Sequence, residues 1–143
     1  MKTIMLGAAG FALLVVSAAS HAQWDDDTEY TGYSHYQGKK YASSMPAETL
    51  TASPDFDIAN ATLPKSIKDI TEVARTQLEK VTGPKSGWKL SDINLHRSNR
   101  NEKKWFYAVN FSPPSMAGDN ISIIATVDGR LGVLKEISER KIE

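Results

Sequence analysis

The sequence predicts an α+β domain in which one amphipathic helix packs on one face of a small antiparallel sheet of three to four strands. Between Pro64 and Gly83, apolar residues recur with the 3.6-residue period of a helix. From there to Ile137 they follow the two-residue period of strands with one buried face. Asp128-Gly129 lies between two apolar runs and is typical of a tight hairpin turn, which requires positive φ.

The helix is expected to begin near Pro64 and to end at Gly83. Pro64 suits the first helical turn, with Thr62 or Leu63 near the N-cap. Gly83 followed by a proline is a stop signal, because glycine adopts left-handed conformations and proline cannot continue a helix. The predicted buried face consists of Ile67, Ile70, Val73, Ala74, Leu78 and Val81.

Three alternating runs predict the strands, and in each run one parity is richer in large apolar groups. The expected buried parity is Ile93 and Leu95, then Trp105, Tyr107, Val109 and Phe111, then Ile121, Ile123, Ala125 and Val127. Trp88 and Leu90 are out of phase with these, so a bulge is expected near Ser91-Asp92. The polar residues 98–103 predict a hairpin tip, and the last strand is expected from about Leu131 to Ile137.

The other face of the sheet has no intramolecular cover in this scheme, because only one helix is predicted. Its members are mostly small or polar: Asn94, His96, Phe106, Ala108, Asn110, Ser122, Ile124 and Thr126. Phe106 and Ile124 are the exceptions. They are interpreted as ordinary surface residues, with a shallow partner site or the face of a homodimer that extends the sheet as alternatives.

Residues 1–22 have the features of a secretory signal peptide. A lysine follows Met1, an uncharged apolar run extends from Ile4 to Val16, and Ser20 and Ala22 occupy the −3 and −1 positions of a cleavage site. The alternative is a membrane anchor, but the run is shorter than the ~20 residues that a spanning helix needs. We therefore expect a periplasmic or secreted protein without a membrane span after cleavage.

Composition divides the remaining chain into residues 23–54 and a single domain of residues 55–143. The first part holds five acidic residues against two lysines, several tyrosines and almost no aliphatic side chains. Such a composition predicts a mobile segment. We hypothesise that its acidic residues contact the basic hairpin tip around Arg97, Arg100, Lys103 and Lys104. The chain contains no cysteine, which excludes a disulfide-stapled extracellular domain and is compatible with a bacterial periplasm.

From Pro64 to Ile137, roughly half of the chain, the order of elements resembles the PepSY and PepSY-like domains of exported bacterial proteins. The resemblance rests on an amphipathic helix that ends at a glycine, the aromatic-rich strand 105–111, and the segment 123–134 with its Asp128-Gly129 turn. It implies a cystatin-like α+β fold, an exported location, and a role in restraining peptidases or in binding within the envelope. The loop 112–118 is longer than in a simple hairpin of that family, and the family supplies no catalytic residue.

The sequence predicts neither a catalytic centre nor a cofactor or metal site. After cleavage only His35 and His96 remain as histidines, no thiolate is available, and no His-x-x-x-His pair offers zinc ligands. No serine lies in a nucleophile-elbow motif. The acidic run 25–27 lacks the preplaced oxygens of a Ca²⁺ site. Residues 103–107 mix lysines with aromatics as single-strand nucleic-acid binders do, but an exported protein rarely meets nucleic acid, so no such partner is expected.

These observations favour a non-enzymatic binding or regulatory module that acts on an envelope protein or a peptidase. The predicted partner-binding residues are Phe106, Ile124, Asn110, His96, Arg97, Arg100, Lys103 and Lys104. One alternative is a secreted structural or stress protein without a specific ligand, either monomeric or a homodimer. The third interpretation, a small hydrolase, has the least support.

Overall fold

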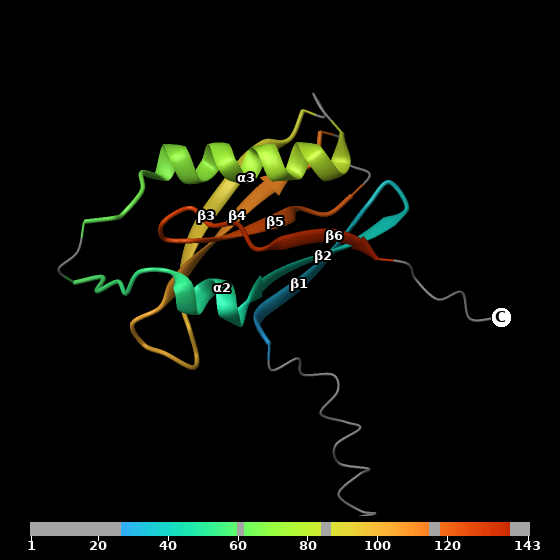
Figure 1. Ribbon diagram of the computed structural model, residues 1–143. Coiled ribbons are helices and arrows are strands. Elements are labelled where there is room, and N and C mark those ends of the chain that lie inside the picture. Colours follow the sequence, from blue (N-terminus) through green and yellow to red (C-terminus); the bar gives the residue numbers. More distant parts are fainter. Residues whose placement is uncertain (1–26, 60–61, 84–86, 115–117, 138–143) are drawn as a thin grey trace, which may run out of the picture.

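The protein has two three-stranded antiparallel sheets and one long helix, as seen in a computed structural model that describes residues 27–59, 62–83, 87–114 and 118–137 (Figure 1). The elements are β1 (Thr28–Tyr36), β2 (Lys39–Pro46), α2 (Ala47–Ala52), α3 (Ile67–Thr82), β3 (Lys89–Arg97), β4 (Trp105–Ser112), β5 (Ile121–Thr126) and β6 (Val133–Ile137). The predicted class is confirmed as a mixed α/β protein that is mostly sheet. The expected signal peptide lies outside the described residues.

Helix α3 begins later than expected, because the cap is Ser66 rather than Thr62 or Leu63. The Ser66 side chain accepts a hydrogen bond from the Asp69 N–H at 3.1 Å, which satisfies one of the free donors of the first turn. The helix ends where predicted, with Gly83 at φ 110° donating its N–H to the Glu79 carbonyl. Its buried residues are Ile70, Ala74 and Leu78, whereas the predicted burial of Ile67 is wrong, since this residue of the first turn is exposed.

The sheet of order β3-β4-β5 lies beneath α3, and its predicted buried parity is confirmed. Tyr107 and Val109 share one core with Ile70 and Leu78 of the helix. The β3–β4 register shifts between Leu90 and Asp92, which confirms the expected bulge. The polar tip also lies where predicted, between the end of β3 at Arg97 and the start of β4 at Trp105.

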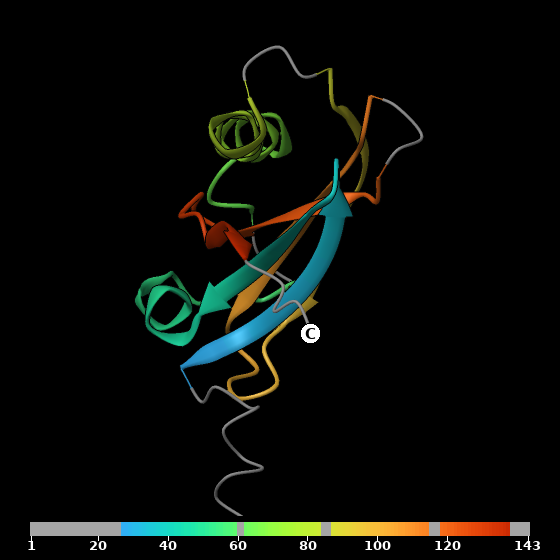
Figure 2. The same ribbon diagram turned by 90° about the vertical axis from the view of Figure 1, so that its right-hand side faces the viewer.

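The opposite face of this sheet is covered, contrary to expectation, by the chain's own N-terminal part. Residues 28–52, predicted to be mobile, form the hairpin β1–β2 and helix α2. The hairpin closes with a two-residue turn in which Gln37 and Gly38 have φ values of 51° and 75°, the conformation that tight hairpins favour. Figure 2 shows β1 and β2 crossing in front of β4.

A second, smaller core lies between this hairpin and the sheet. Its buried members are Met45, Leu50, Phe106, Ala108 and Ile124, and Tyr30 packs against them. The predicted exposure of Phe106 and Ile124 is therefore wrong, since they are 4% and 2% exposed. The N-terminal part has few aliphatic side chains. Met45 and Leu50 are nevertheless enough to cover this face of the sheet, because the face carries few large residues.

Strand β6 joins the two sheets. The Asp128-Gly129 turn forms as predicted, with the Gly129 N–H bonded to the Thr126 carbonyl at 3.0 Å and φ 89° at Gly129. The returning chain pairs with β5 only through a bridge between Ala125 and Leu131. It then crosses at Gly132 to pair with β2, giving the sheet order β1-β2-β6. The predicted last strand exists, but it belongs to the second sheet.

Gly132 is the crossing point, and its backbone is bonded on both sides. Its N–H donates to the Ile124 carbonyl at 2.7 Å, and its carbonyl accepts from Gln77 Nε2 at 2.9 Å. A Cβ here would lie 2.2 Å from the Ser44 carbonyl oxygen and 3.2 Å from that of Ile124. The close approach of β2 and β5 at this point therefore requires glycine.

Replacing Gly132 with alanine should lower the free energy of unfolding by about 1–3 kcal/mol, because the methyl group forces two backbones apart. Urea unfolding followed by fluorescence measures the change. Val133→Ala, at an exposed neighbouring position, is the matched control and should change stability by less than about 0.5 kcal/mol. Equal stabilities of Gly132→Ala and the unmodified protein would contradict the close crossing.

Alkaline pH should destabilise the fold through Tyr107. Burial raises the pKa of its hydroxyl, which has no hydrogen-bond partner among the described residues. Above an unfolded pKa of about 10 the unfolded chain loses this proton while the folded chain retains it, so stability falls as pH rises from there. Tyr107→Phe should leave stability at pH 7 unchanged or higher and flatten the decline between pH 9 and 11, measured by urea titration at each pH.

Tyr33→Phe is the control for this measurement, because Tyr33 is exposed and its replacement should leave the alkaline decline intact. Burial also raises the pKa of Tyr41, so part of the decline persists in Tyr107→Phe. Identical pH profiles for Tyr107→Phe and Tyr33→Phe would show that Tyr107 does not contribute.

Candidate functional site

The apolar and uncharged residues predicted to bind a partner do not form an accessible surface. Phe106 and Ile124 are buried in the smaller core. Asn110 is engaged within the sheet, where its Nδ2 donates to Asp92 Oδ1 and its Oδ1 accepts from the Ser122 hydroxyl. His96 is exposed, but its ring stacks on Phe106 with centroids 5.5 Å apart. Phe106, Ile124 and His96 thus contribute to packing between the hairpin and the sheet, and Asn110 to contacts within the sheet.

One basic residue of the hairpin tip meets an acidic residue from the N-terminal part, as hypothesised: Glu29 of β1 lies 3.8 Å from Arg100 Nε. Lys104 Nζ lies 3.0 Å from Asp55, which belongs to the predicted domain 55–143. The Glu29 contact comes from a fixed strand rather than from a mobile tail. The Glu29 side chain is 4% exposed, and its Oε1 accepts from the Ser98 hydroxyl at 2.7 Å and from the Asn99 N–H at 2.8 Å.

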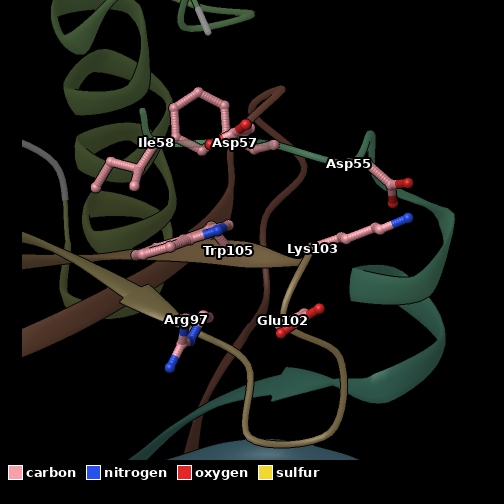
Figure 3. A pocket seen from close by; sticks show the side chains of 8 residues that line it. Asp55, Asp57, Ile58, Arg97, Glu102, Lys103 and Trp105 are labelled. Carbon is pink, nitrogen blue, oxygen red and sulfur yellow. The ribbon is translucent and has the colours of Figure 1, made fainter. Parts of the chain in front are cut away.

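A surface pocket of about 520 Å³ opens beside this tip (Figure 3). Its walls come from two stretches far apart in the sequence. Residues 55–58 follow α2, and the others belong to the end of β3, the tip and the start of β4; the lining is Asp55, Phe56, Asp57, Ile58, Arg97, Glu102, Lys103 and Trp105. The Phe56 N–H donates to the Lys103 carbonyl at 2.8 Å, which fixes the first stretch against the second.

The pocket has an apolar centre and a charged rim. Phe56 meets Trp105 edge to face, with ring centroids 6.3 Å apart and planes at 85°. Ile58 lies at the mouth and is 60% exposed. The rim carries two cations, Arg97 and Lys103, and three carboxylates from Asp55, Asp57 and Glu102. This arrangement offers apolar contact and charge pairing.

Two of the predicted site residues, Arg97 and Lys103, line this pocket, and Arg97 and Arg100 also line a neighbouring shallow pocket of about 400 Å³. Sequence reasoning missed residues 55–58 and assigned Trp105 only to the core. The signal was present in Phe56, an aromatic residue isolated between α2 and α3 that required a packing partner. Nothing in the sequence said that this partner was Trp105.

Other chemistry-bearing groups lie elsewhere. His35 Nδ1 is 3.8 Å from Asp119 Oδ2, and both side chains are more than half exposed. Within the described ranges, no group of three or more His, Cys, Asp or Glu residues is placed to hold a metal ion.

Comparison with protein-family models, curated protein sequences and solved structures finds no match to this chain. The resemblance to PepSY-like domains thus stays a prediction. What the fold defines is a mixed α/β protein with two antiparallel sheets and a peripheral pocket. None of the helices in the described part of the chain is long and apolar enough to cross a bilayer.

Replacing Glu29 with alanine should destabilise the protein by about 1–3 kcal/mol, because the Ser98 hydroxyl and the Asn99 N–H lose their acceptor. The amide resonances of residues 98–101 should also shift, since the tip loses its anchor. Thermal unfolding and NMR spectra measure both effects. Glu48→Ala, at an exposed position, is the control and should change neither. An unshifted Asn99 amide in Glu29→Ala would rule out the anchor.

Proposed function

We propose that the protein is an exported, non-enzymatic binding module that engages a protein partner in the cell envelope through the pocket of Phe56, Ile58 and Trp105. The observation that carries the proposal is the pairing of an exposed apolar residue at the mouth with an aromatic interior. The export part rests on the signal-peptide pattern of residues 1–22.

The pocket suits a protein side chain better than a small ligand. It is open and shallow, whereas small-molecule sites usually enclose most of their ligand. Aromatic residues and arginine are enriched in protein interfaces, and the binding energy concentrates where such anchors fill a pocket. A rim with charges of both signs supports a partner that carries an apolar residue flanked by charged ones.

The partner class follows from the exported location. An envelope protein is the general proposal, and a peptidase is the particular class that the PepSY-like resemblance adds. Binding would restrain or position that partner without a chemical step. The hydrogen bond from the Phe56 N–H to the Lys103 carbonyl fixes the two walls of the pocket against each other. Little of the binding energy would therefore be needed to order the pocket.

Ile58→Asp should abolish partner binding without loss of stability, because the residue is exposed in a loop and contributes its apolar surface to the pocket mouth. Proteins captured from envelope extract by the unmodified chain are compared with those captured by the variant. Ile67→Asp, at another exposed isoleucine away from the pocket, is the matched control and should retain the partner. A partner retained by Ile58→Asp, or the absence of any stoichiometric partner, would contradict the proposal.

A further inference from the structure

The outer edge of β1 carries unpaired backbone groups. β1 is the terminal strand of its sheet, paired on one side with β2. His35 points its backbone to the other side, because its N–H donates to Asp119 Oδ2 at 3.1 Å and its carbonyl accepts from the Asp119 N–H at 2.7 Å. In an antiparallel strand alternate residues point their backbone groups to the same side. Thr31 and Tyr33 therefore present their N–H and C=O groups at this edge.

The register of β1 with β2 is regular from Tyr30 to Tyr36, so this alternation holds along the stretch. Within the described residues, the edge groups of Thr31 and Tyr33 have no hydrogen-bond partner. One end of the edge is closed by Asp119 and by the bridge between Tyr36 and Gly118. Proteins usually protect long open edges, and here the stretch around Thr31 and Tyr33 remains open among the described residues.

The sheet face beside this edge is basic and partly apolar. Register places one set of residues on the outer face: Thr31, Tyr33, His35, Lys40, Ala42, Ser44, Val133, Lys135 and Ile137. Tyr33 is 62% exposed, and Lys40 Nζ lies 4.9 Å from the centre of its ring. Of the two lysines in the set, Lys40 reaches over β1 to the Tyr33 ring, so a carboxylate on a strand added at this edge finds opposite charge there.

We propose that the β1 edge binds an extended, acidic segment of a partner protein by strand addition. The segment's backbone pairs with Thr31 and Tyr33, which gives affinity. Its alternate side chains lie on the outer face, where a carboxylate approaches Lys40 and an apolar group covers the Tyr33 ring. A second copy paired through β1 offers no carboxylate to Lys40, because the outer face of β1 carries Thr31, Tyr33 and His35. This surface is formed by β1, β2 and β6, so it is separate from the pocket of Phe56 and Trp105.

The test uses the full chain and a synthetic peptide. The probe is a capped peptide of about seven residues, a typical strand length. Every second residue, which lies on the outer face, is in turn glutamate or valine, and the residues between them are threonine. Its matched control has the same sequence with N-methyl groups on the backbone nitrogens that face β1. NMR titration should shift the Thr31 and Tyr33 amides with the first peptide. The N-methylated peptide should bind at least about tenfold more weakly, since the ladder hydrogen bonds are lost.

Two pairs of variants give further discrimination. Thr31→Pro removes the N–H at the edge and should abolish peptide binding. Thr31→Ala keeps this N–H and should bind the peptide normally. Proline is tolerated at edge positions of this kind, so the first variant should fold. Lys40→Glu should weaken binding of the acidic peptide. Ile58→Asp should leave it unchanged, which separates this surface from the pocket.

Three results would overturn the proposal. The first is the absence of shifts at Thr31 and Tyr33 at millimolar peptide. The second is equal binding of the N-methylated peptide, which would indicate non-specific charge attraction. The third is concentration-dependent broadening of these amides without peptide, together with a dimer in light scattering, which would assign the edge to a second copy of the chain.

Discussion

The fold depends on the burial of both faces of the β3-β4-β5 sheet by different parts of the same chain. Helix α3 covers one face, and the β1–β2 hairpin with α2 covers the other. Full burial of a side chain such as Met45, Phe106 or Ile124 contributes about 1.5–3 kcal/mol each. The net stability of a domain is only about 5–15 kcal/mol. The hairpin is therefore an integral layer of the domain, and residues 28–52 cannot be separated from it without exposing a core.

The same packing positions the candidate binding surfaces. With the hairpin in place, Glu29 fixes the β3–β4 tip and Lys104 bonds to the chain that follows α2. These contacts hold residues 55–58 against Trp105 and so form the pocket. The hairpin also leaves β1 as a terminal strand with an open stretch of edge. Core packing in this protein thus determines where its accessible apolar and hydrogen-bonding groups lie.

Much of the C-terminal half was predictable, because the periods of α3 and of β3, β4 and β5 are strong local signals. The layer formed by the β1–β2 hairpin and α2 was not predictable. Its cover comes from Met45 and Leu50 in a stretch with a polar average, and the Gln37-Gly38 turn is a weaker signal than Asp128-Gly129. The position of β6 depends on pairing with β2, which is far away in sequence. For the site, Arg97 and Lys103 were found from charge, but Phe56 and Ile58 were missed because the pocket forms between distant segments.

The most direct test of whether the β1–β2 hairpin covers the second face of the β3-β4-β5 sheet is an NMR measurement on the chain that begins after the predicted cleavage site. We expect nuclear Overhauser effects from the Met45 methyl group to the Phe106 ring or the Ile124 methyl groups, with slow hydrogen exchange at the Ser43 amide. Random-coil shifts for residues 28–46, with no such contacts, would contradict this packing.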